Sequence, residues 1–267
     1  MKTTKRIVAS LAAALCIAPL AGFAAAPERI ESEGDYPPHL QGVCTDGKSI
    51  WWSHTVELVR TDLKGHVLAH AKGLKSHHGD LCVADGTVYV AVNHGKFNTE
   101  DKADSWVYAY RGDDLSFIRR WQVPELCHGA GGMTFKDGHF FVIGGLPDTH
   151  DRNYVYEYTP EFKFVKRHVL ESGWTNLGIQ TVDYSDGKFY FGCYGGKRKS
   201  GEKKVPSLTL VSPDDLSSVE KREPSVCEGI LKLDGKLWRA QIKALDRTVP
   251  RSKMRYRAWL TPVKWRK

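Results

Sequence analysis

The chain has 267 residues, charged side chains at 26% of its positions and a formal net charge of +8 at neutral pH. This length is enough for one fair-sized globular domain. The basic excess is too small for a protein dedicated to nucleic acids, so we expect no nucleic-acid partner. Beyond the N-terminal leader, no segment approaches the roughly 20 apolar residues that a membrane-spanning helix needs, so we expect no membrane span.

The first 26 residues have the layout of a secretory signal peptide. Lys2, Lys5 and Arg6 precede an apolar stretch over residues 7–20, and small residues follow around Ala24. We expect cleavage after Ala24 and one folded domain over residues 27–267, located in the periplasm or outside the cell. Because the leader carries three basic residues, its removal lowers the net charge to +5.

Five Asp-Gly pairs, each followed by a short apolar or aromatic run, recur along the rest of the chain. They begin at Asp46, Asp85, Asp137, Asp186 and Asp234, at spacings of 39, 52, 49 and 48 residues. An Asp-Gly pair between two such runs is a strong β-hairpin signal, and a recurrence at this period is typical of a β-propeller. The pattern therefore predicts an all-β fold, a propeller with five blades.

Each copy also contains a third run and a turn that leads to a fourth. The third runs are rich in aromatic and β-branched residues and cover 57–60, 106–110, 154–158, 208–211 and 256–259. Four antiparallel strands make one blade. The last copy ends soon after its third run, so we predict that residues 28–38 supply the outer strand of that blade. This strand would close the ring and remove the exposed sheet edges.

Five cysteines remain after the leader: Cys44, Cys82, Cys127, Cys193 and Cys227. They include no Cys-x-x-Cys pair, so they suggest neither a redox motif nor a structural zinc site. We expect small buried core residues, with one disulfide open to them in an oxidising compartment.

Seven of the eleven histidines fall at one predicted rim of the propeller, opposite the Asp-Gly turns. They precede first strands or follow second strands, which end at the same face of a blade: His39, His54, His77, His78, His94, His128 and His150. The three longest insertions, at 93–105, 144–153 and 194–207, lie on the same face. Long loops on one side of a rigid scaffold are a usual place for binding and chemistry.

Two histidines and two carboxylates at this rim are our candidate metal ligands: His78, His128, Asp80 and Glu228. Imidazole and carboxylate groups suit a divalent metal ion. Without metal, His78 and His128 are candidates for general acid and base, and the structural alternative is that they hydrogen-bond backbone groups between blades. The candidate substrate-binding residues are Gln41, Asn176, Gln180, Lys197 and Arg198, the two cations being suited to an acid group.

With its leader and repeated hairpins, the chain resembles secreted bacterial β-propellers of the broad NHL/SMP-30-like or lyase-like kind. The resemblance covers all five repeats and lies in the architecture. For lactonase-like members it implies calcium held by Glu228, Asn176 and Asp80. For lyase-like members it implies a metal held by His78, His128 and Gln41 or Gln180.

We therefore expect an exported monomer that binds a carbohydrate or other anionic small ligand on the histidine-rich face. If it is an enzyme, we expect a lyase or hydrolase assisted by one divalent metal ion. Two alternatives stay open. One is a non-catalytic binding scaffold with Trp174, Tyr194 and Phe97 as stacking platforms, and the other is a calcium-dependent lactonase.

Overall fold

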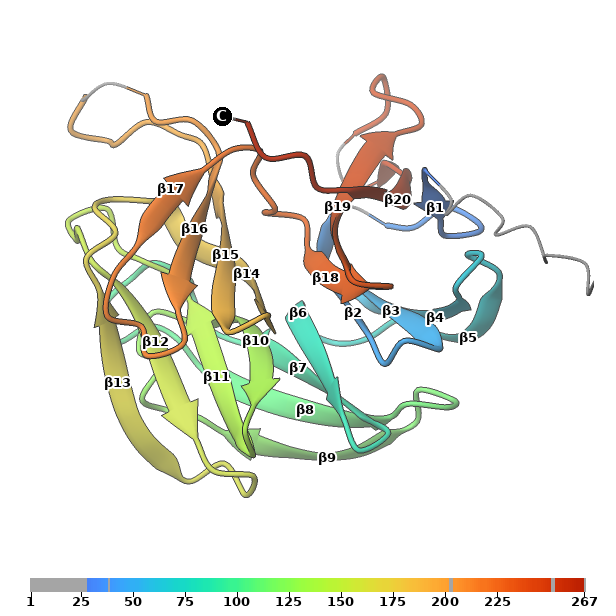
Figure 1. Ribbon diagram of the computed structural model, residues 1–267, viewed down its shortest axis with the longest axis horizontal. Helices are drawn as coiled ribbons and strands as arrows, with labels where there is room; N and C mark the ends of the chain where they lie inside the picture. The colour runs from blue at the N-terminus through green and yellow to red at the C-terminus, as the bar shows by residue number, and fades with distance from the viewer. Residues whose placement is uncertain (1–27, 38, 202–203, 251–252, 267) are drawn as a thin grey trace, which may run out of the picture.

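The computed structural model describes residues 28–37, 39–201, 204–250 and 253–266. The predicted signal peptide and its cleavage site lie outside these ranges. The described residues form five four-stranded antiparallel sheets arranged as the blades of a propeller, which confirms the predicted fold class (Figure 1). None of the described residues forms a helix that is long and apolar enough to cross a membrane.

The first four blades each take four consecutive strands. Blade 1 contains β2 (Leu40–Thr45), β3 (Ser49–His54), β4 (Glu57–Asp62) and β5 (Val67–Ala71). Blade 2 contains β6 (His77–Ala84), β7 (Thr87–Asn93), β8 (Ser105–Arg111) and β9 (Phe117–Gln122). Blade 3 contains β10 (Ala130–Lys136), β11 (His139–Gly144), β12 (Asn153–Tyr158) and β13 (Phe164–Leu170). Blade 4 contains β14 (Asn176–Ser185), β15 (Lys188–Tyr194), β16 (Leu208–Pro213) and β17 (Glu220–Arg222).

Blade 5 combines the two ends of the folded chain. It contains β18 (Ile230–Leu233), β19 (Lys236–Ala244), β20 (Tyr256–Pro262) and, as its outer strand, β1 (Ile30–Glu31). Ile30 pairs with Leu260 and Glu31 pairs with Trp259 in antiparallel register. The prediction that the N-terminal segment closes the ring is therefore confirmed.

The Asp-Gly pairs connect the first and second strands of all five blades, as predicted. In four of them the Asp and the Gly both have positive φ, for example 47° at Asp85 and 71° at Gly86. Two successive positive φ angles are typical of the type I′ turn, whose twist matches that of a β-hairpin. The turn at Asp46 is wider, since β2 ends at Thr45 and β3 begins at Ser49.

The hydrophobic core is divided among the interfaces between blades. Five clusters of buried apolar side chains each join residues from two neighbouring blades. The cluster between blades 4 and 5 is the smallest, with Tyr190, Val211, Val226 and Ile230 as its buried members. All five cysteines are free thiols, and the expected core position holds for Cys44, Cys82 and Cys193.

The inner strands approach one another closely around the buried carboxylate of Asp80 on β6. Its Oδ2 accepts the Val182 N–H from blade 4 at 2.7 Å. A Cβ atom added to Gly42 of blade 1 would lie 1.7 Å from Asp80 Oδ1, and one added to Gly132 of blade 3 would lie 2.8 Å from Asp80 Cβ. Asp80 therefore connects its own blade with three others.

The Asp80→Ala variant should lower the free energy of unfolding by about 2–4 kcal/mol, because it leaves the Val182 N–H unpaired in the interior and opens a cavity. Asp80→Asn should cost much less, since it keeps an oxygen acceptor of the same shape. Urea unfolding of both variants measures the difference. Equal losses would show that the hydrogen bond does not contribute to the stability of the axis.

Candidate functional site

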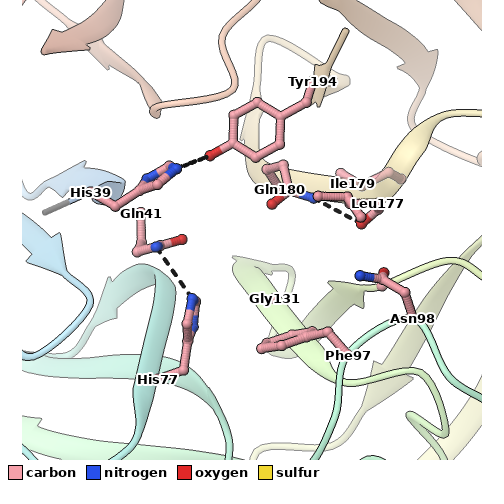
Figure 2. A pocket seen from close by; sticks show the side chains of 11 residues that line it. His39, Gln41, His77, Phe97, Asn98, Gly131, Leu177, Ile179, Gln180 and Tyr194 are labelled. Atoms are coloured by element: carbon pink, nitrogen blue, oxygen red, sulfur yellow. Dashed lines mark hydrogen bonds between the residues drawn. The ribbon is translucent and has the colours of Figure 1, made fainter. Parts of the chain in front are cut away.

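A cavity of about 240 Å³ opens where the first strands of four blades begin. Eleven residues line it: His39, Gln41, His77, Phe97, Asn98, Gly131, Gly145, Leu177, Ile179, Gln180 and Tyr194 (Figure 2). We call it the axial cavity. None of these eleven described residues carries a carboxyl group, so the cavity wall consists of imidazole, amide, phenol, aromatic and apolar groups.

The axial cavity owes its lining to irregularities in the inner strands. In β2, Leu40 pairs with His54 and Gly42 with Ser53, so Gln41 is an extra residue in a β-bulge. Gly131 is the extra residue in β10. In β14 the register shifts between Asn176 and Thr181, and the segment between them supplies Leu177, Ile179 and Gln180. Bulges redirect side chains at the rims of sheets, and here they turn side chains toward the cavity.

Several residues at the cavity have a positive backbone φ angle, which residues other than glycine adopt less often. His39 has φ of 83°, Asn98 of 60° and Leu177 of 63°. Such strain persists only where the surrounding structure enforces it, and it is concentrated at functional sites.

Polar atoms from three blades face the axial cavity. Gln41 Nε2 lies 3.3 Å from His77 Nε2 and donates to the Thr55 hydroxyl at 3.0 Å, which leaves Gln41 Oε1 toward the cavity (Figure 2). Gln180 Nε2 donates to the Leu177 carbonyl at 2.9 Å, so its Oε1 also faces inward.

The amide of Asn98 is held by the backbone on the opposite side of the axial cavity. Its Oδ1 accepts the Leu146 N–H at 2.9 Å, and its Nδ2 points into the cavity (Figure 2). The nearby Phe97 ring contacts the His77 ring edge-to-face, with 5.0 Å between ring centroids. Burial lowers the pKa of His77, which favours its neutral form.

Tyr194 and His39 form the remaining wall, and Glu228 lies behind them. The Tyr194 hydroxyl lies 2.8 Å from His39 Nε2, and His39 Nδ1 lies 3.7 Å from Glu228 Oε2. The Glu228 carboxyl is mostly buried, and burial raises its pKa to about 7. Glu228 was predicted as a metal ligand, and its neighbour in this wall is the imidazole of His39.

Of the predicted substrate-binding residues, Gln41 and Gln180 line the axial cavity and the other three do not. Asn176 Nδ2 donates to the Gly195 carbonyl at 2.9 Å and so supports the loop after β15. Arg198 forms an ion pair with Asp151 and lies 5.4 Å from the ring centroid of Trp174. Lys197 is exposed on the same loop.

His78 and Asp80 lie away from the axial cavity. His78 is buried, its Nε2 lies 2.7 Å from the Tyr110 hydroxyl, and burial lowers its pKa to about 4. Asp80 is buried between the inner strands, and burial raises the pKa of its carboxyl well above the usual range. His78 therefore contacts a side chain of its own blade, whereas the structural alternative expected backbone partners between blades.

The four predicted metal ligands do not converge. Among the described residues, the only group of three or more potential ligand atoms within 4.8 Å of one another joins Glu100, Cys127 and His128. His128 therefore remains a candidate ligand, now with two partners that the sequence pattern did not identify. His128 Nε2 lies 3.0 Å from Glu100 Oε2, whereas its buried Nδ1 has no hydrogen-bond partner among the described residues.

Sequence reasoning placed Phe97 and Tyr194 among the stacking platforms, and both line the axial cavity. It assigned His39 and His77 to the correct rim but did not select them. Trp174, the third predicted platform, lines a separate surface cavity with Pro206, Lys221 and Arg222.

Comparisons with known proteins identify the fold alone. No protein-family model matches the chain, and no curated protein matches it. Among solved structures it is similar to a xylan β-1,4-xylosidase from Bacillus Halodurans C-125, with 13% identity and a TM-score of 0.58, over 89% of this chain and 55% of that one. It also matches the computationally designed Ika4 protein, with 11% identity and a TM-score of 0.40, over 69% of this chain and 96% of that one. The chain thus spans about half the length of the xylosidase.

The raised pKa of Glu228 predicts how stability depends on pH. The folded state holds this proton more tightly than the unfolded state, so the contribution of Glu228 to stability falls as pH rises from about 4.5 to about 7. Glu228→Gln should remove this loss, which is on the order of 3 kcal/mol at most because the side chain is 21% exposed.

The measurement is urea unfolding of the wild type and Glu228→Gln at pH 4.5 and pH 8. The variant should gain stability relative to the wild type at the higher pH. Glu171→Gln is the control, since that side chain is exposed. If the difference in unfolding free energy between the wild type and Glu228→Gln were the same at both pH values, the raised pKa of Glu228 would be contradicted.

Proposed function

We propose that the axial cavity binds a small carbohydrate unit and that this binding is the function of the protein. The observation that carries the proposal is the combination of aromatic rings and hydrogen-bonding groups that four blades bring to one cavity. Sugars present apolar C–H faces and many hydroxyl groups. A site for them therefore needs flat apolar surface together with several fixed donors and acceptors.

The lining groups match this requirement. Phe97 and Tyr194 supply ring surface, the Oε1 atoms of Gln41 and Gln180 accept hydrogen bonds, and Asn98 Nδ2 donates one (Figure 2). Because none of the eleven described lining residues carries a carboxyl group, an anionic sugar meets no like charge on the part of the wall that they form. Typical pockets for drug-sized ligands measure about 300–1,000 Å³. A cavity of about 240 Å³ therefore suits one sugar unit better than a long oligosaccharide.

The structural neighbour is consistent with a carbohydrate ligand. The xylosidase shares the propeller architecture over most of this chain. At 13% identity this likeness extends to the fold, so the ligand class rests on the cavity itself.

We also propose that the protein acts outside the cytoplasm as a monomer, within the broad group of secreted NHL/SMP-30-like or lyase-like propellers. Export is supported by the leader over residues 1–26. The calcium-dependent lactonase is less favoured, since Asn176 supports a loop and Asp80 is buried at the axis.

Replacing residues of the axial cavity should weaken sugar binding. Phe97→Ala and Gln180→Leu should each lower the affinity about 5- to 30-fold, because each removes about 1–2 kcal/mol of stacking or hydrogen bonding. A panel of neutral and acidic oligosaccharides identifies the ligand, and isothermal titration calorimetry measures the affinities.

Matched controls lie on outer strands. Phe164→Ala on β13 and Gln122→Leu on β9 remove the same side chains from exposed positions and should leave the affinity unchanged. If no sugar in the panel binds, or if the control variants weaken binding as much as the cavity variants, the proposal fails.

We further propose that Glu100, Cys127 and His128 bind one divalent metal ion, with zinc as the best match. Thiolate, imidazole and carboxylate are all zinc ligands. The ligand atoms lie within 4.8 Å of one another. Burial and the carboxylate of Glu100 raise the pKa of the Cys127 thiol, and a bound cation would favour its deprotonated form. Glu100 lies in the loop between β7 and β8 of blade 2, and Cys127 and His128 lie in the connection from β9 to β10, which joins blades 2 and 3.

Elemental analysis of protein purified without chelator should find one zinc ion per chain. The Cys127→Ser/His128→Gln double variant should lose the metal, because only one of the three ligands remains. His66→Ala is the control, as that histidine lies in the turn between β4 and β5 and is exposed. Absence of metal from the wild type, or its retention in the double variant, would contradict this proposal.

A further inference from the structure

Three polar side chains form a chain that begins at the axial cavity and runs into its wall. The Tyr194 hydroxyl lies 2.8 Å from His39 Nε2. On the other side of the same ring, His39 Nδ1 lies 2.8 Å from the Leu40 carbonyl oxygen and 3.7 Å from Glu228 Oε2. Figure 2 shows the Tyr194 hydroxyl directed at the His39 ring.

These contacts determine which ring nitrogen of neutral His39 carries the N–H proton. The Leu40 carbonyl is an acceptor, so Nδ1 carries the ring proton and donates it. Nε2 is then unprotonated and accepts the hydrogen bond from the Tyr194 hydroxyl. This is the arrangement in which an imidazole withdraws a proton from a hydroxyl group and so activates it.

The surroundings would stabilise the imidazolium ion that this transfer forms. The Leu40 carbonyl and the Glu228 carboxylate both face Nδ1, and a buried carboxylate near a histidine holds and orients the charged ring. The contacts with the Leu40 carbonyl and the Tyr194 hydroxyl hold the His39 ring in this position.

We propose that Tyr194 and His39 are an acid–base pair that acts on a uronate-containing carbohydrate in the axial cavity and cleaves it by β-elimination. This inference rests on the proposed function, because it requires a sugar bound in the same cavity. Glu228 has the role of a positioning residue behind His39.

The reaction needs only groups that the cavity and the substrate supply. His39 Nε2 takes the phenol proton of Tyr194, and the phenolate removes the proton on C5, the carbon next to the sugar carboxylate. The freed electron pair forms the C4=C5 double bond while the C4–O4 bond breaks. The Tyr194 hydroxyl then returns its proton to the departing O4, and His39 returns its proton to Tyr194. One glycosidic bond is broken without water or an oxidant.

The cavity also supplies a group that stabilises the charge formed on the sugar carboxylate. Asn98 Nδ2 is a donor that points into the cavity (Figure 2), and donors directed at developing charge lower the barrier. Glycoside hydrolysis would instead use two carboxyl groups flanking the bond, about 5–5.5 or 6.5–9.5 Å apart. The eleven described lining residues contain no carboxyl group, so their chemistry favours elimination over that mechanism.

The test incubates the full chain with two soluble 4-linked polyuronates and follows the ultraviolet absorbance of the new conjugated double bond. Polymannuronate is the expected substrate, because its C5–H and C4–O4 bonds lie on the same face of the sugar, where one tyrosine can act as both base and acid. Polygalacturonate, in which these bonds lie on opposite faces, is the comparison and should not be cleaved. The wild type should form unsaturated product. Tyr194→Phe and His39→Gln should each lower turnover about 100-fold or more, in the range expected for a general acid–base group. In calorimetry with the same polyuronates, Tyr194→Phe should still bind within about threefold of the wild type.

Tyr184→Phe is the matched control, because the Tyr184 hydroxyl bonds to Asp214 at the far end of the blade, and it should retain wild-type turnover. Binding of polymannuronate without unsaturated product, or equal turnover in Tyr194→Phe, would overturn the acid–base assignment and leave the binding function standing. Failure of every sugar to bind would overturn the binding function itself.

Discussion

The hydrogen bond from the Val182 N–H to the Asp80 carboxylate is made where four of the five blades meet. Burial raises the pKa of this carboxyl group well above the usual range, because a charge in the interior is very costly. Gly42 and Gly132 provide the room, because a Cβ atom at either position would collide with Asp80. The spacing of the inner strands, and with it the width of the axial cavity, depends on this close approach.

The inner strands cannot remain regular as they leave this crowded axis. β2, β6, β10 and β14 each contain a register shift near the end that faces the axial cavity, whereas the short β18 pairs regularly with β19. The shifts bring Gln41, Gly131 and Gln180 to the cavity wall. The same bulges therefore accompany the close packing of the inner strands at the axis and bring these residues to the cavity wall.

The same bulges separate what the sequence could predict from what it could not. The Asp-Gly turns and aromatic runs are local signals, and they identified the blades and the strand that closes the ring. A strictly alternating β6 would place the side chains of His78 and Asp80 on one face of the strand. In that strand two residues, Gly79 and Asp80, oppose one residue of β7, so alternation breaks between His78 and Asp80. Contacts between distant blades, such as Tyr194 with His39, leave no local pattern.

The closure of blade 5 also determines the order in which the molecule can be completed. Ile30 is among the first residues of the described chain to be synthesised, and its partner Leu260 is among the last. Blades 1 to 4 consist of consecutive strands, so each can form its sheet as soon as its own segment has emerged. The ring, in contrast, stays open until Leu260 has been synthesised. Until β20 has been synthesised, the segment that becomes β1 has no strand to pair with, and blade 5 lacks its outer strand.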